Sequence, residues 1–274
     1  MVFYLMERYV IGIKRACKVI DLTRSMWYYH SKKDDVDLVV KLSELAQEYP
    51  TRGFDEYYNK LRREGYKWNR KRLLRVYRSM KLGLRRKHKK RIISRVKQPL
   101  EQPNMLNQCW SMDFMSDALA DGRKLRILNI IDDCNREALA IEVGLNYPAK
   151  RVIQTLEELE GEIGLPKSLR CDNGPEFIAK VFQKWCKKKR IELKYIQPGK
   201  PMQNGYIERF NRFYREDILD AYWFEDLHQI RALTNKWRED YNENHPHKSL
   251  GNISPREYRK RNLQEASFLQ MNIT

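Results

Sequence analysis

The chain has 274 residues, of which 42% are hydrophobic and 33% are charged, with 54 Lys and Arg against 36 Asp and Glu. The hydrophobic content excludes a disordered chain, and the formal charge of +18 predicts a polyanionic partner. No apolar run approaches the roughly 18 residues of a membrane span, and no segment is basic on one face alone. Nucleic acid is therefore favoured over a membrane.

The cysteines indicate the compartment. The five of them are widely spaced, have apolar neighbours and form no C-x-x-C pair. A disulfide framework and a zinc site are therefore not expected, and a reducing cytoplasm fits. The start MVFYLMERYV is too short and too soon charged for a signal peptide, which also predicts a cytoplasmic protein.

The first 83 residues are helical in pattern and predict two helix-turn-helix regions. In residues 1–33, a short apolar-periodic segment is followed by a turn near Asp21–Thr23 and a second helix from Arg24 to His30. Residues 34–83 predict a second helix-turn-helix, a DNA-binding domain. Its helices are expected at about 36–49, 54–64 and 69–80.

The third of these helices has an apolar side and a basic side. It is predicted to bury Leu73, Leu74 and Tyr77. Its polar face carries four cations that suit a major groove or a phosphate backbone: Arg70, Lys71, Arg75 and Arg78. A solvated helix face is an equally good interpretation of the same charges.

Residues 84–105 are dense in Lys and Arg and contain two prolines, which predicts a basic linker. Such a linker can track phosphates, and a plain solvated tether explains the composition almost as well. The linker separates the helical region from a segment of different character.

Residues 106–222 alternate between strands and helices and form the predicted core. Strands are expected at 109–115, 124–132, 136–143, 168–172 and 191–196. Helices are expected at 148–164, 176–189 and 202–217. Three antiparallel strands, then helix, strand, helix, strand and helix, predict an α/β fold with a mixed five-stranded sheet, the order found in ribonuclease-H-like folds. Residues 223–274 are expected to form a C-terminal helical extension.

Three carboxylates in this core border apolar neighbours, where a charge is expensive. Asp113 lies inside the first strand, Asp172 ends the fourth, and Glu208 lies on the last helix. Like charges in one pocket raise each other's pKa, and a pair of Mg²⁺ or Mn²⁺ ions removes that repulsion. Two such metals about 4 Å apart can activate a nucleophile and stabilise the leaving oxygen of a phosphodiester. The acids therefore predict phosphodiester chemistry.

The helix that carries Glu208 has an apolar stripe and a polar rim. At about 100° per residue, the stripe contains Ile207, Phe210, Tyr214 and Ile218. The rim contains Asn204, Glu208, Asn211 and Arg215. The simplest role for Glu208 is a surface ion pair with Arg212. The alternative is that Glu208 closes a metal site and the cations around it meet DNA phosphates.

Five segments resemble the second-frame (orfB) product of insertion sequence 3 family transposases, relatives of retroviral integrase. They are WSMDFM, CDNGPEF, QNGYIERFNRFYRE, RREGYKWNRKRLLRVYR and YNENHPHKSLGNISPREY. Thirty-five residues separate Asp172 from Glu208, and Arg215 occupies the family's basic position seven residues past the glutamate. His245 departs from the family's usual Arg, and RGFDEYY departs from its aromatic-glycine-tyrosine run.

The resemblance implies that Asp113, Asp172 and Glu208 are the metal-binding catalytic acids of a DDE-type DNA strand transferase using two Mg²⁺ or Mn²⁺ ions. It implies cleavage at the element's ends, transfer of the 3′-OH into DNA, and a copy-out, paste-in route through a circular intermediate. The implied partners are terminal inverted repeats, target DNA, an upstream-frame product and further copies of the chain on DNA. The implied location is the bacterial nucleoid.

Several alternatives stay open beside this hypothesis. A metal-dependent nuclease without joining activity, and a non-enzymatic helix-turn-helix regulator, are the two rival functions. Asp132 and Asp133 are either a fourth acidic group or, preferably, a strand-end turn. His247 is a DNA contact or, more commonly for a loop histidine, a structural residue. Asn204, Arg212 and Arg215 are candidate DNA contacts, and Trp110 and Trp185 are predicted to be core.

Overall fold

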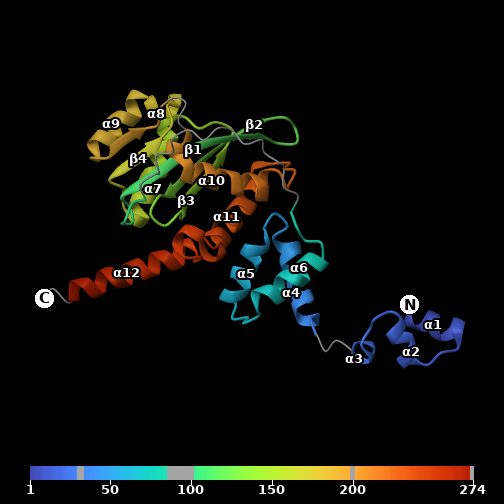
Figure 1. The fold of residues 1–274 in the computed structure, drawn as a ribbon. Coiled ribbons are helices and arrows are strands. Elements are labelled where there is room, and N and C mark those ends of the chain that lie inside the picture. Colours follow the sequence, from blue (N-terminus) through green and yellow to red (C-terminus); the bar gives the residue numbers. More distant parts are fainter. Residues whose placement is uncertain (30–33, 85–101, 198–200, 272–274) are drawn as a thin grey trace. The chain divides into compact units, whose positions relative to one another are not determined.

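The computed structural model describes residues 1–29, 34–84, 102–197 and 201–271, and the chain divides into two compact units, Met1–Ser43 and Glu44–Thr274 (Figure 1). Most of the predicted linker at 84–105 lies outside the described residues. The bounds predicted for the domains stay a prediction. Among the described residues, no helix is long and apolar enough to cross a membrane.

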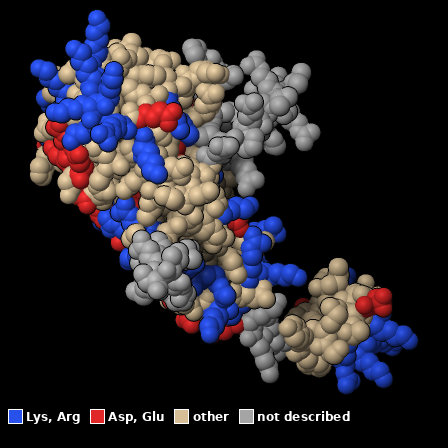
Figure 2. Space-filling view, turned by 90° about the vertical axis from the view of Figure 1, so that its left-hand side faces the viewer, with Lys and Arg blue, Asp and Glu red and all other residues tan. Residues whose placement is uncertain are grey.

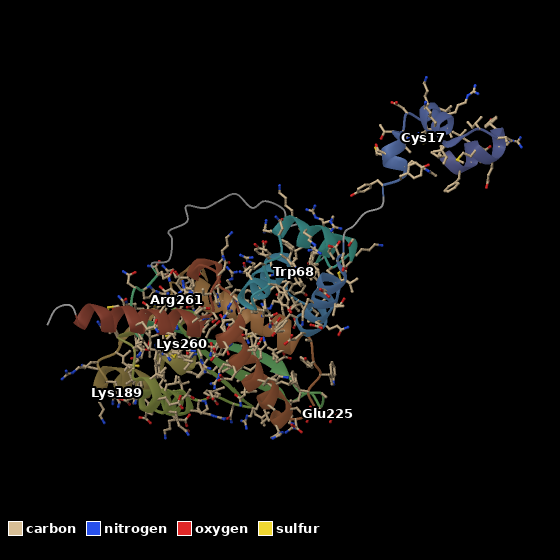
Figure 3. The ribbon with its side chains drawn as sticks, turned by 90° about the horizontal axis from the view of Figure 1, so that it is seen from below. Cys17, Trp68, Lys189, Glu225, Lys260 and Arg261 are labelled. Carbon is tan, nitrogen blue, oxygen red and sulfur yellow. The ribbon has the colours of Figure 1, made fainter. Side chains whose placement is uncertain are left out.

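The first unit is made of short helices. They are α1 (Val2–Tyr9), α2 (Ile13–Val19), α3 (Arg24–Trp27) and the beginning of α4 (Val36–Glu48), which continues into the second unit. Val2, Ala16 and Cys17 form a buried apolar cluster, and Figure 3 shows Cys17 among these helices. The predicted turn is present, with Asp21 in the left-handed region at φ 53°. The sequence did not predict α1.

Helices α5 (Phe54–Arg63) and α6 (Arg70–Ser79) form a pair in the second unit. Gly65 ends the first of them at φ +93°, a conformation that favours glycine. The Asn69 side chain caps α6 by accepting a hydrogen bond from the Lys71 N–H at 2.8 Å. The buried residues of α6 are Leu73, Val76 and Tyr77. The prediction that Leu74 is buried was therefore wrong, and Val76 is buried instead.

The predicted mixed five-stranded sheet is confirmed. The strands are β1 (Cys109–Ala118), β2 (Lys124–Asp132), β3 (Ala138–Gly144), β4 (Ser168–Cys171) and β5 (Glu192–Tyr195). Their order across the sheet is β3-β2-β1-β4-β5, in which β1, β2 and β3 are antiparallel while β4 and β5 run parallel to β1. This is the ribonuclease-H-like arrangement, with β1 at the centre of the sheet.

Helices cover both faces of the sheet, and each face has its own apolar core (Figure 1). One face is covered by α7 (Ala149–Ile163), α8 (Pro175–Ile178) and α9 (Lys180–Lys188). The other is covered by α10 (Gly205–Tyr214), the π-helical turn η2 (Arg215–Leu219) and α11 (Leu227–Asn244). The prediction of a single helix at 176–189 was wrong, because Ala179 has an extended ψ of 132° and separates α8 from α9.

Three further elements complete the second unit. They are η1 (Pro201–Asn204), η3 (Lys248–Leu250) and the final helix α12 (Pro255–Met271). Trp110 and Trp185 lie in the core as predicted, at 0% and 9% exposure. All five cysteines are free and buried.

Candidate active site

The strand register brings two of the predicted acids to the same level of the sheet. In the parallel pair of β1 and β4, Ser111 lies opposite Arg170. Two residues further along each chain segment stand Asp113, inside β1, and Asp172, just past the end of β4. The carboxyl end of a parallel strand is where ligands gather in α/β sheets. The fold therefore places these two carboxylates at the edge where a site is expected.

Asp113 is half-buried and held by two donors. Its Oδ1 accepts the Phe114 N–H at 2.9 Å, and its Oδ2 accepts an amide N–H of Asn211 at 2.7 Å. Burial, together with the charges of Asp172 and Glu208, raises the pKa of this carboxyl to about 6 against the lowering effect of the two donors. Asp172 and Glu208 therefore lie near enough to Asp113 for their charges to affect its ionisation.

Asp172 is positioned by the turn that follows it. Its Oδ1 accepts the Gly174 N–H at 2.9 Å, and Pro175 then begins α8. A Cβ added to Gly174 would lie 2.9 Å from the same carboxylate oxygen. This accounts for the glycine in the segment CDNGP, because a side chain at position 174 would displace Asp172.

Glu208 is exposed in the first turn of α10. The ion pair considered for it with Arg212 is not formed, because the Arg212 Nε pairs with Glu216 at 2.7 Å. Partial desolvation raises the pKa of Glu208. Glu208 is therefore an acid that faces the site without a basic partner among the described residues.

The chemistry of these donors fits a hard divalent cation, since all three are carboxylates. Among the described residues, no three acidic, histidine or cysteine side chains lie close enough together to hold a metal ion as they stand. The acids thus share a field without converging on one point. Carboxylates repel one another, and a bound divalent cation would remove that repulsion.

The apolar stripe predicted for α10 is confirmed. Its members Ile207, Phe210, Tyr214 and Ile218 are all buried. On the rim, Asn204 is 2% exposed, and Asn211 links the helix to Asp113. The sequence analysis placed Asn211 on this rim but gave it no role. Asn211 lies three residues after Glu208, a spacing that puts two side chains side by side on a helix, and this was the signal that could have assigned it to the site.

Comparison with known proteins decides the family. Two models described as integrase core domain match residues 103–201 and 189–255. An uncharacterised 31.7 kDa protein of insertion element IS407 from Burkholderia multivorans is 37% identical over 254 residues, covering 92% of each chain. The transposase InsD of insertion element IS2 from Escherichia coli is 30% identical over 239 residues, covering 82% of this chain and 79% of InsD.

This chain belongs to the insertion sequence 3 family of transposases. Two solved structures also match: the catalytic core of HTLV-2 integrase in complex with magnesium, and the catalytic core of BIV integrase. The first is 17% identical with a TM-score of 0.44, covering 56% of this chain and 95% of the viral one. The second is 22% identical with a TM-score of 0.45, covering 58% and 99%. The transposase is a DDE-type polynucleotidyl transferase with an integrase core.

Two candidate DNA contacts of the transposase have partners within the chain. Arg215 donates to the Ser116 carbonyl at 2.9 Å and lies 3.4 Å from Asp117, so it ties the end of α10 to β1. Arg70 pairs with Asp55 and lies over the Phe54 ring at 5.3 Å. Their contact with DNA stays a prediction.

His247 is 7% exposed, and its ring lies 5.4 Å from that of Tyr241 and 4.8 Å from that of His245. Burial lowers its pKa to about 3, so the ring is neutral at physiological pH. This placement supports the structural alternative, and DNA contact stays a prediction. His245, in place of the family's usual Arg, stacks on Tyr241 at 5.1 Å.

Asp132 and Asp133 form the strand-end turn preferred from the sequence. Both are fully buried. Asp132 accepts the N–H groups of Asn107 and Cys134, each at 2.8 Å. Asp133 accepts the Ser111 hydroxyl at 2.6 Å and pairs with Arg170 at 2.7 Å. Their oxygens are thus occupied by structural hydrogen bonds.

Proposed function

We propose that the chain cleaves DNA at the ends of its insertion element and joins the freed 3′-OH to other DNA, with Asp113, Asp172 and Glu208 as its catalytic acids. The observation that carries the proposal is the position of Asp113, on the central strand and within the field of both other acids. The other acidic group of the core, at Asp132 and Asp133, already has its oxygens bonded within the fold. DNA as the substrate follows from the family and from the charge of +18.

In this proposal the three acids hold two Mg²⁺ or Mn²⁺ ions. When bound, such ions would favour deprotonation of the attacking water or hydroxyl and stabilise the leaving oxygen. The chain's own contribution is orientation: two donors fix Asp113, the Gly174 N–H fixes Asp172, and exposed Glu208 approaches from α10.

The reaction has two displacements at phosphorus. First, the water oxygen attacks the phosphodiester at the element's end, the bond to the 3′ oxygen breaks, and that oxygen takes a proton to become a 3′-OH. Second, this 3′ oxygen loses its proton, attacks a phosphodiester of other DNA and displaces the 3′ oxygen there, which takes up a proton. In both steps negative charge develops on the oxygens of the reacting phosphate. One set of acids, with the cations that it would hold, can therefore serve both steps.

DNA contacts are proposed on two surfaces. On α6, Lys71, Arg75 and Arg78 are exposed, and on α10 Arg212 is exposed. We further propose that the chain acts in the bacterial cytoplasm as an oligomer on DNA, together with an upstream-frame product. Efficient transposition by this chain alone would contradict the last part.

Neutralisation of each acid tests the enzyme. The variants Asp113→Asn, Asp172→Asn and Glu208→Gln keep side-chain size and remove one anionic metal ligand. Each is expected to reduce Mg²⁺- or Mn²⁺-dependent strand transfer on a labelled terminal-repeat duplex by roughly 10³-fold or more. DNA binding in a gel shift and the melting temperature are expected to persist, because neutralisation removes repulsion between carboxylates.

The matched controls are Asp121→Asn, in the exposed turn between β1 and β2, and Glu225→Gln, an exposed acid before α11 (Figure 3). Both are expected to keep wild-type strand transfer. An active acid variant would remove that residue from the catalytic set. Parallel loss of binding and melting temperature in all three would make the acids structural. Cleavage without joined products in the wild type would favour the rival nuclease.

A further inference from the structure

Asn129 is a buried amide on a strand that is otherwise apolar at this level. It stands between Leu128 and Ile130 in β2 and is 0% exposed. Its Oδ1 is buried and has no hydrogen-bond partner within the described residues. A buried, unpaired polar oxygen lowers the stability of the fold. The residue therefore needs a reason other than packing.

The contacts of Asn129 lead to the active site. In the antiparallel register, Asn129 lies directly opposite Asp113. Its Nδ2 donates to the Asn211 Oδ1 at 2.7 Å and also faces the Met115 Sδ at 3.2 Å. The Asn211 Nδ2 in turn donates to the Asp113 Oδ2 at 2.7 Å. Two amides thus connect the neighbouring strand, through α10, to a catalytic acid.

The chain of hydrogen bonds has one direction. An ionised carboxylate can accept hydrogen bonds but cannot donate them, so Asn211 must turn its NH₂ group toward Asp113. Its carbonyl oxygen then faces Asn129, which must donate. Without that donor, the Asn211 amide can rotate by half a turn and present an oxygen to the carboxylate.

We propose that Asn129 is a positioning residue that acts through Asn211 to hold Asp113 in the orientation that receives a divalent cation. This inference rests on the proposed function, in which Asp113 is a metal ligand. Groups that contact a metal's ligands fix the direction of the ligands' lone pairs, and their loss typically weakens metal binding by about 10–100-fold. The buried, unpaired oxygen of Asn129 lowers the stability of the fold, and this loss accompanies the positioning role.

Asn129→Leu in the full chain tests the inference, because leucine has a similar volume and no donor. The Mn²⁺ concentration for half-maximal strand transfer is expected to rise about tenfold. Calorimetric titration with Mn²⁺ in the absence of DNA is expected to show the same weakening. The melting temperature is expected to stay constant or rise, because the buried unpaired oxygen is gone. A residue with a merely structural role would lose stability instead.

A double-mutant comparison shows whether Asn129 acts through Asn211. If it does, Asn129→Leu adds no further change in the Mn²⁺ requirement once Asn211→Ala is present. Thr155→Val is the matched control, since it removes a buried hydroxyl that bonds Tyr147 beneath the opposite face of the sheet. It is expected to lower the melting temperature and leave the Mn²⁺ requirement unchanged.

Three results would overturn the inference: an unchanged Mn²⁺ requirement in Asn129→Leu, a full effect that persists in the Asn211→Ala background, or a fall in melting temperature parallel to the loss of activity. Asp113→Asn in the same assays separates this failure from failure of the proposed function. If Asp113→Asn stays active, the proposed function is wrong, whereas an inactive Asp113→Asn beside an unaltered Asn129→Leu rejects the positioning role alone.

Discussion

In the turn after β4, the absence of a side chain at Gly174 determines the position of Asp172, a proposed catalytic acid. The Gly174 N–H holds one oxygen of Asp172, and the space where a side chain would begin at Gly174 is taken by that same oxygen. The φ of Gly174 is −59°, so its backbone suits any residue. Steric contact with the carboxylate, not backbone freedom, therefore requires glycine here.

We expect Gly174→Ala to lower strand transfer by roughly tenfold or more, because a shift of Asp172 by a fraction of an ångström would misplace the metal ion that it holds in the proposed function. The melting temperature should fall little, since the turn is partly exposed. Gly161→Ala is the control, because a Cβ there meets nothing within 4 Å on α7. It should keep activity and gain stability. Wild-type activity in Gly174→Ala would mean that Asp172 is not confined by this turn.

At the scale of elements, the π-helical turn η2 joins the helical pair to the catalytic core within the second unit. Asp217 in this turn accepts hydrogen bonds from Thr51, Arg52 and the Trp237 indole N–H. Arg52 is 8% exposed, so its guanidinium depends on this carboxylate for charge compensation. The turn directly continues α10, and the same helix that carries Glu208 is thereby anchored at its far end.

Asp217→Ala is expected to lower the free energy of unfolding by about 3–5 kcal/mol, because it leaves a buried cation without its main partner. Asp220→Ala provides the comparison, since Asp220 is exposed, follows the same turn and lies 3.6 Å from Arg215. That change should stay within about 0.5 kcal/mol. Denaturant unfolding of the full chain measures both, and a small effect at Asp217 would show that the Glu56 carboxylate compensates Arg52.

Across the whole molecule, the excess of positive charge is concentrated in patches. On the face shown in Figure 2, Lys and Arg side chains form several groups, with acidic side chains beside some of them. Helix α6 exposes Lys71, Arg75 and Arg78 on one part of the second unit. Helix α9 exposes a comparable group: Lys184, Lys187 and Lys188. Charge count alone does not distinguish a DNA surface from a solvated one.

Replacement of the three α6 cations by Gln is expected to flatten the salt dependence of DNA binding by about 0.9 in log–log slope for each DNA phosphate that the variant no longer neutralises. The same replacement of the three α9 lysines, with equal change in net charge, should leave the slope nearly unaltered. Fluorescence anisotropy on terminal-repeat DNA over a range of salt measures both. The reverse result would move the DNA surface from the helical pair to the core.

Local chemistry in the sequence determined which elements form and which residue types they bring. The apolar periods of residues 109–144 and the stripe beginning at Ile207 predicted the strands and α10, since burial of a face needs that spacing whatever lies opposite. The three acids could be named for the same reason, because each stands beside apolar neighbours in its own element. One residue with an extended backbone, Ala179, interrupts a helix that the periodicity favoured, and no local signal marked it.

Tertiary structure alone decided which polar groups meet. Asn129 and Asn211 are 82 residues apart in sequence, and their hydrogen bond exists because the β1–β2 register and the packing of α10 bring both to Asp113. The packing of the chain also places the Arg215 guanidinium against the Ser116 carbonyl and buries His247. Hydrogen bonds depend on distance and direction within a few tenths of an ångström, and only the packed chain fixes these.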